Sequence, residues 1–180
     1  MAWTTPKTWT DGSVLTAAEL NEQVRDNLDF LNSKPISVSN LDEAANYTTT
    51  STTFVDVDAT DLGRTITTSG GDVLVWCSNI YMKATARVGV FFNIDVNGSL
   101  VAADDGIAKA TFVDSIAIDG LGTGNYAVLS FAFVVENVAS GSNTFKLQWK
   151  QSNATQTVTW YVGAGTTDAD IHPQFGVKEL

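Results

Sequence analysis

The chain has 180 residues, and twenty acidic residues against ten basic ones give a formal net charge of −10. Nucleic-acid binding needs clustered Lys and Arg, and the basic residues here are scattered, so nucleic acid is not an expected partner. The length allows one domain of ordinary size with a small appendage. Cys77, the only cysteine, lies in an apolar run and is expected to be a buried, inert thiol.

The N-terminal residues carry no apolar region of the kind that signal peptides have. No apolar run approaches the roughly 18 residues that a membrane span needs. We therefore expect synthesis in a cytoplasm and no membrane span.

Local chemistry predicts one amphipathic helix near the N-terminus. Thr16-Ala17-Ala18-Glu19 fits a capping box, and Leu15 with Leu20 supplies the hydrophobic staple. The apolar residues of the helix fall within an arc of about 80° on a helical wheel: Ala17, Leu20, Val24, Leu28 and Leu31. So narrow a stripe favours contact with one or two partner helices, and a helix lying on its own domain is the alternative.

Residues 1–35 are predicted to form an arm and a helix that serve as an anchor or oligomerisation element. The arm holds two tryptophans, which are uncommon on the surface of a free monomer, so we expect them to insert into the body, a sister subunit or another protein. Ser33-Lys34-Pro35 ends the helix. The predicted anchor residues are Trp3, Trp9, Leu15, Leu20, Val24, Leu28 and Leu31.

Residues 36–51 read as a polar connector, and residues 52–180 as a β-sandwich body. Val73 to Met82 is apolar on both faces as far as Ser78, as in a central strand. Asn97-Gly98 predicts a type I′ hairpin turn. Eight to ten strands separated by turn signals, with no helix among them, predict an antiparallel jelly roll or β-sandwich.

Residues able to perform catalysis or bind metal are few. His172 is the only histidine, and its place before Pro173 favours a structural or surface role. Carboxylate pairs for glycoside hydrolysis could come from Asp56/Asp58, Asp104/Asp105 or Asp168/Asp170, but acidic residues in an acidic protein are usually solvated. Asp56, Asp58 and Asp61 offer oxygen ligands for calcium without the spacing of an EF-hand loop, and Asp170 with His172 is a further metal candidate.

Two further features concern ligand binding: a Gly-rich loop and a group of aromatic residues. The Gly-rich loop at residues 120–125 has no following Lys-Ser/Thr and is no phosphate cradle. Tyr126, Trp160 and Tyr161 could stack on sugar rings, although core packing explains Trp160 equally well. We expect no catalytic residue, no cofactor and no metal.

The stretch "TWTDGSVLTAAELNEQVRDNLDFL", together with Trp3, resembles the N-terminal segment of many small bacteriophage virion proteins, described as tail, tail-fibre or minor structural proteins. Within the body, "GGDVLVWCS", "FNIDVNGS" and "FGVKEL" are similar to small phage proteins that look like trimeric jelly rolls of the tumour-necrosis-factor/C1q kind. The resemblance implies a homotrimeric structural subunit in the virion, on the tail, on a short fibre or as a head decoration. It also implies contacts with other virion proteins through the N-terminal region.

A second hypothesis is a carbohydrate- or receptor-binding module whose loops at the tip of the sandwich attach the particle to a host-surface glycan or receptor. A hydrolase is the third. It requires a carboxylate pair across a groove, within about 10 Å.

Overall fold

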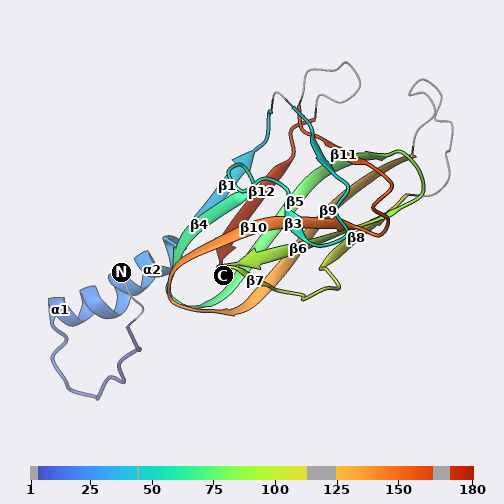
Figure 1. Cartoon of the computed structure of the whole chain (residues 1–180). Helices are drawn as coiled ribbons and strands as arrows, with labels where there is room; N and C mark the ends of the chain where they lie inside the picture. Colours follow the sequence, from blue (N-terminus) through green and yellow to red (C-terminus); the bar gives the residue numbers. More distant parts are fainter. Residues whose placement is uncertain (1–3, 44, 113–124, 164–170) are drawn as a thin grey trace.

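The computed structural model describes residues 4–43, 45–112, 125–163 and 171–180. Two antiparallel sheets pack face to face as a β-sandwich with jelly-roll character, and a helical segment projects from one end (Figure 1). The predicted fold class is confirmed. No helix in the described part of the chain is long and apolar enough to cross a membrane.

Sheet A is built around one long central strand, β5 (Gly71–Ala84), which is apolar on both faces over its first half. One edge of β5 pairs with β12 (Gln174–Glu179) and then β11 (Val158–Tyr161), and the other edge pairs with β9 (Asn125–Val138). β1 (Ile36–Asn40) extends the sheet beyond β12, and β2 (Tyr47–Thr49) extends it beyond β11. Segments distant in sequence therefore meet on one sheet.

Sheet B is centred on β10 (Gly141–Gln151), which pairs with β6 (Gly89–Val96) on one side. On its other side β10 pairs with β4 (Gly63–Thr68) and β3 (Val55–Asp56). β7 (Ser99–Leu100) and β8 (Ala108–Thr111) both pair with β6. Asn97 and Gly98 have φ values of 52° and 90° between β6 and β7, in agreement with the predicted I′ turn.

The core lies between the sheets and is rich in aromatic side chains. Phe92 and Trp149 from sheet B contact Trp160 from sheet A, with ring centroids 6.1–6.4 Å apart. On β6 the inward residues Val90, Phe92 and Ile94 are fully buried. Trp160 is therefore a core residue and is excluded as a sugar platform. Cys77 is buried in the same core, as predicted.

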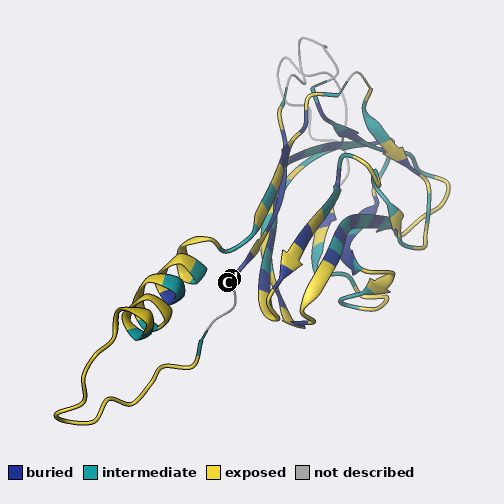
Figure 2. Cartoon of the chain, turned by 90° about the vertical axis from the view of Figure 1, so that its left-hand side faces the viewer, coloured by how far each residue is buried: buried dark blue, intermediate teal, exposed yellow. Residues whose placement is uncertain are grey.

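The N-terminal helix begins where the sequence predicts and changes form in its middle. α1 (Ala17–Leu20) starts with the complete Thr16/Glu19 capping box. A π-helical stretch, η1 (Asn21–Asp26), follows and continues into α2 (Asn27–Asn32). Residues 4–15 turn at Asp11 and Gly12, so that Thr4 and Lys7 lie against the helix. We call residues 4–34 the finger; it stands away from the sandwich (Figure 2).

Residues 36–51 are part of the body. Within the segment expected to be a polar connector, residues 36–51, the structure forms β1 and β2, which belong to sheet A. These strands are three to five residues long and are held by backbone pairing with β12 and β11, which a polar sequence does not prevent. Trp3, one of the predicted anchor residues, lies outside the described residues.

Candidate assembly surface

The large apolar side chains of the helix, together with Trp9 and Leu15 of the arm, face solvent in the single chain, and we call them the finger stripe. Leu28 is 60% exposed, and the other members are between 44% and 56% exposed: Trp9, Leu15, Leu20, Val24 and Leu31. Burying one such leucine side chain stabilises a structure by roughly 1.5–3 kcal/mol relative to exposure. The stripe is thus not packed on its own domain, and a partner that covered it would gain considerable free energy.

A different side of the helix is covered by the arm. Asn27 is buried and exchanges two hydrogen bonds with the backbone of Thr4, and Gln23 Oε1 accepts from Lys7 N at 2.7 Å. Lys7 Nζ also forms an ion pair with Glu19, and this contact together with the hydrogen bonds from Thr16 lowers the pKa of the Glu19 carboxyl to about 2. The arm and helix therefore form one unit that leaves the stripe free.

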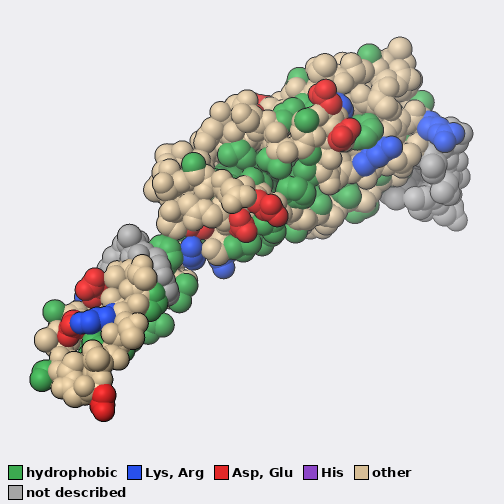
Figure 3. Space-filling view, turned by 90° about the horizontal axis from the view of Figure 1, so that it is seen from below, with side chains coloured by type: hydrophobic (Ala, Val, Ile, Leu, Met, Phe, Trp, Pro, Cys, Tyr) green, Lys and Arg blue, Asp and Glu red, His purple; other side chains and the backbone are tan. Residues whose placement is uncertain are grey.

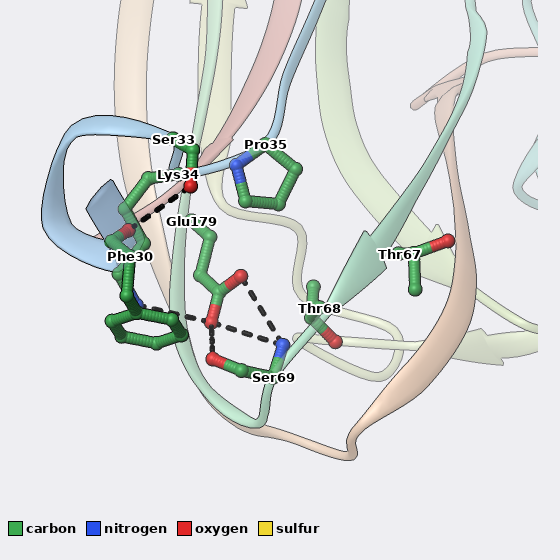
Figure 4. A pocket seen from close by; sticks show the side chains of 8 residues that line it. All are labelled: Phe30, Ser33, Lys34, Pro35, Thr67, Thr68, Ser69 and Glu179. Atoms are coloured by element: carbon green, nitrogen blue, oxygen red, sulfur yellow. Dashed lines mark hydrogen bonds and ion pairs between the residues drawn. The ribbon is translucent and has the colours of Figure 1, made fainter. Parts of the chain in front are cut away.

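A buried carboxylate connects the finger to the body (Figure 4). Glu179 on β12 is 2% exposed and accepts hydrogen bonds from Ser69 N, Ser69 Oγ and Lys34 Nζ. Lys34 Nζ also lies 4.5 Å from the ring centroid of Phe30 on α2. Burial alone would raise the pKa of Glu179, but the bonds from Ser69 and Lys34 outweigh it and lower the pKa. The helix is thereby held to the end of the sandwich.

The stripe continues onto the body at this junction. Leu31 lines a groove of about 740 Å³ together with Ile36 on β1 and Leu180 after β12. Ile36 is 57% exposed and Leu180 is 55% exposed. The groove therefore joins the apolar stripe of the finger to the outward side of sheet A.

The outward side of sheet A carries two rows of paired residues that cross four strands and are apolar except for Lys178. One row of paired residues runs from β9 to β1: Val134, Leu74, Lys178 and Ile36. The next row is Ala132, Trp76, Gly176 and Val38. The Trp76 ring lies directly over Gly176, because a Cβ added there would be only 2.1 Å from Trp76 Cζ2. Trp76 Nε1 donates to Gln174 Oε1 at 3.0 Å, which fixes the ring in this position.

Three tyrosines from three strands lie together further along the same side. The Tyr81 ring on β5 stacks on Tyr126 of β9 at 5.6 Å and lies 5.5 Å from Tyr161 of β11. Val128, which is paired with Tyr81, is 70% exposed. Sequence reasoning singled out Tyr126 and Tyr161 but did not bring them together, because only the pairing of β5 with β9 and β11 does so.

These outward side chains carry no carboxylate between the Leu74 row and the tyrosines, although the chain has twenty acidic residues. Asp72 and Glu136 lie beyond the Leu74 row, at the far end from the tyrosines. The charged side chains on the outward side are Lys178, in the Leu74 row, and Lys83, which is paired with Tyr126. The outward side of sheet B is different: Asp56 there binds Lys146 and Gln148. Copies of an acidic chain can approach one another along sheet A without repulsion between carboxylates.

A groove at the edge of the sandwich adds to the exposed apolar surface. It has a volume of about 700 Å³ and lies between β7 and β9, with Leu100, Val101 and Phe133 among its lining residues. In the described part of the chain β9 pairs only with β5, so its second edge is unpaired. Seen from below in Figure 3, hydrophobic side chains gather over the middle of the body and along the helical segment. Unpaired edges of this kind readily add another chain.

The residues considered for catalysis and metal binding do not converge. Asp56 binds Lys146 and Gln148, whereas Asp58 caps a turn through the amides of Thr60 and Asp61. Among the residues that the structure describes, no group of three or more His, Cys, Asp or Glu side chains is placed to hold a metal. The loop at 120–125 falls outside the described residues except for Asn125, and Asp168 and Asp170 lie outside them entirely.

His172 contacts the backbone and an acidic side chain of the body. His172 Nδ1 lies 3.2 Å from the Leu41 carbonyl oxygen and 3.7 Å from Asp42 Oδ1. Nearby, partial burial and the charge of Asp61 raise the pKa of Glu43. Neither arrangement presents a nucleophile with an adjacent base.

Taken together, the finger stripe, the junction groove and the outward side of sheet A form one surface, which we call the assembly surface. It places the chain among β-sandwich proteins that expose an extended apolar face. No protein-family model matches the sequence, and no curated protein does so either.

Comparison with solved structures finds only distant matches. A search finds latent PorU from Porphyromonas gingivalis, with 14% identity and a TM-score of 0.39 over 81% of this chain and 13% of that one. The infectious bursal disease virus VP2 subviral particle has 9% identity and a TM-score of 0.38 over 82% of this chain and 37% of that one. The chain thus spans only a small part of these proteins, and similarity at this level carries no information about function.

Proposed function

We propose that this protein is a non-enzymatic structural subunit of a bacteriophage particle, a homotrimer that belongs to the tail, to a short fibre or to the surface decoration of the virion. The tail or a short fibre is favoured over the head. The observation that supports self-assembly is the continuity of exposed apolar surface from Leu20 on the finger to Val134 on sheet A. The resemblance of residues 3–31 to phage virion proteins supports the virion assignment.

In this proposal the assembly surface is divided between two contacts. The sheet A part, centred on Trp76 lying over Gly176, packs against a second copy of the chain. Tyrosine and tryptophan contribute strongly to interfaces because they bury a large area and lose little conformational freedom. The finger stripe packs against the fingers of sister subunits and extends toward the protein on which the trimer docks.

Light scattering on the full chain tests the assembly. We expect a mass about three times the 19.2 kDa of one chain. Leu20→Asp with Val24→Asp removes the finger contact, and Leu74→Glu with Val134→Glu removes the sheet A contact; each pair should lower the mass or raise the concentration at which the oligomer dissociates. Thr67→Glu with Thr111→Glu, on exposed positions of sheet B, is the control with the same added charge.

A monomeric wild-type chain at millimolar concentration contradicts the proposal, as does an oligomer that is insensitive to both pairs. The virion assignment is tested separately. Mass spectrometry of density-purified particles of the phage that encodes the chain should detect it, and gold-labelled antibodies should locate it on the tail.

A further inference from the structure

The outward side of sheet B contains an alternating row of aromatic and cationic side chains. The row crosses four strands or their ends in the order Phe54, Lys150, Phe91 and Lys109. Phe91 on β6 is paired with Lys150 on β10 and with Lys109 on β8. Phe54 directly precedes β3, whose residues pair with the strand positions next to Lys150. Four residues separated by up to 96 positions in sequence thus form one surface feature, the Lys–Phe row.

The lysines of the row are held against the faces of the rings. Lys150 Nζ lies 4.6 Å from the Phe54 centroid and 5.7 Å from that of Phe91, while Lys109 Nζ lies 4.9 Å from Phe91. Such cation–π contacts fix the direction of long side chains that would otherwise sample many rotamers. Two ammonium groups are therefore positioned beside one ring before any ligand binds.

Two glycines border the Lys–Phe row. A Cβ on Gly106 would lie 3.3 Å from both Phe91 Cβ and Phe54 Cζ, and a Cβ on Gly89 would lie 3.5 Å from Phe91 Cε2. Because neither residue has a side chain, nothing from these positions covers the row. Phe54 and Phe91 are half-buried and Lys109 is exposed, so the row is a shallow, accessible site.

The polar groups around the row include acceptors as well as donors. Lys150 Nζ donates to the carbonyl oxygen of Asp104, and the exposed carboxylates of Asp104 and Asp105 belong to the neighbouring turn. Carboxylates accept hydrogen bonds from hydroxyl groups, and the lysines bind a carboxylate or phosphate. Aromatic rings next to both kinds of group suit a ligand that has an apolar face, hydroxyls and an acidic group.

We propose that the Lys–Phe row binds an acidic saccharide, with a sugar ring packed against Phe91 and its carboxylate or phosphate bound by Lys109 and Lys150. Duplex nucleic acid fits the site poorly, because two lysines beside two aspartates neutralise few phosphates on a protein of net charge −10. The row is on the opposite side of the sandwich from the assembly surface. It therefore stays open when sheet A is covered, and it does not depend on the proposed function.

Biolayer interferometry with the full chain tests this inference. The immobilised probes are polygalacturonate for the carboxylate, a phosphomannan for the phosphate, neutral dextran as the uncharged control and a 30-base-pair DNA duplex. At 150 mM NaCl we expect binding to at least one acidic polysaccharide to be at least tenfold tighter than binding to dextran. The probe that binds shows which acidic group the site prefers.

Variants then locate the site. Lys109→Gln with Lys150→Gln should weaken that binding at least tenfold, and Phe91→Leu should weaken it while retaining both lysines. Lys7→Gln with Arg25→Gln on the finger makes the same charge change and should alter the affinity less than twofold. Circular dichroism and light scattering on each variant verify that the fold and the oligomer are unchanged.

Three results would overturn the inference. The first is that the chain binds neither acidic polysaccharide. The second is that Lys109→Gln with Lys150→Gln leaves the affinity unchanged. The third is that the chain binds the DNA duplex more tightly than either polysaccharide. Failure of the trimer alone would leave the site intact on a monomer, with lower avidity for the polymeric probe.

Discussion

The side-chain amide of Asn27 pairs with the backbone of Thr4 through both of its polar atoms. Oδ1 accepts from Thr4 N at 2.9 Å, and Nδ2 donates to Thr4 O at 3.0 Å and to Gln23 O at 3.2 Å. Asn27 is the buried residue of α2. The arm is thus attached to the helix by a polar contact that uses neither the stripe nor the body.

Changing Asn27 to Asp should release the arm while the helix persists. The aspartate keeps an acceptor for Thr4 N but places a carboxylate oxygen against the Thr4 carbonyl, and losing a buried donor costs about 1–3 kcal/mol. Hydrogen exchange at the Thr4 and Lys7 amides should become about tenfold faster or more. Asn32→Asp, at an exposed position of the same helix, is the control. Unchanged exchange at Lys7 would show that Gln23 alone holds the arm.

Replacing Glu179 with Gln should destabilise the junction between finger and body. Glutamine retains one acceptor for Ser69 but no negative charge for Lys34, which is itself largely buried. We expect the free energy of unfolding to fall by about 1–3 kcal/mol. Denaturant unfolding at pH 7 measures it, with the exposed Glu136→Gln as the control. If Glu179→Gln and Glu136→Gln are equally stable, the bonds to Glu179 make no net contribution to the free energy of unfolding.

The same carboxylate predicts a pH dependence. The pKa of Glu179 is lower in the folded chain than in the unfolded chain, so its contribution is fully present above the unfolded value of about 4.3. It is lost as the pH falls through the folded pKa. Below about pH 4 the stability of the wild-type chain should therefore fall more steeply than that of Glu179→Gln. Parallel pH profiles for the two proteins would assign the acid sensitivity to other carboxylates.

Gly176 and Trp76 should be coupled in a double-mutant cycle. A methyl group at Gly176 would overlap the Trp76 ring, and overpacking of this kind costs about 1–3 kcal/mol. In Trp76→Ser the space is free, so Gly176→Ala should then cost much less. Thermal unfolding of the two single variants and the double variant gives the coupling energy. Simple additivity would show that the ring moves aside without penalty.

Cys77 provides a probe of global unfolding. Burial raises the pKa of its thiol, and the thiolate is the reactive species. Ellman's reagent at pH 8 should not react with the native chain within an hour and should react within minutes in 6 M guanidinium chloride. A fast reaction under native conditions would reveal local opening of β5.

Local signals in the sequence predicted the elements whose chemistry is local. The Thr16/Glu19 capping box and the Asn97-Gly98 turn were both found because each is set by residues within a few positions. The same holds for the exposed stripe of the finger, whose narrow arc is a property of helical spacing. The π-helical turn at Asn21–Asp26 has no such signal in the sequence.

Features that depend on pairing between distant strands could not be predicted. β1 and β2 are too short and polar to be recognised without β12 and β11 beside them. The sequence does not show that Trp76 points outward, because the run around it is apolar on both faces. Its packing over Gly176 depends on the register of β5 with β12. The Lys–Phe row is likewise a property of register, since its members are unremarkable in sequence.

The pairing of β1 with β12 also has a consequence for the order of synthesis. β12 is translated after all the other strands, yet it forms the link between β5 and β1 and carries the Glu179 that holds Lys34. Until β12 has been synthesised, Lys34 lacks the Glu179 carboxylate that binds it, and Trp76 lacks the Gly176 backbone over which its ring lies. The sheet A part of the assembly surface is therefore completed only after β12 has paired with β5, so partly synthesised chains do not present that part to one another.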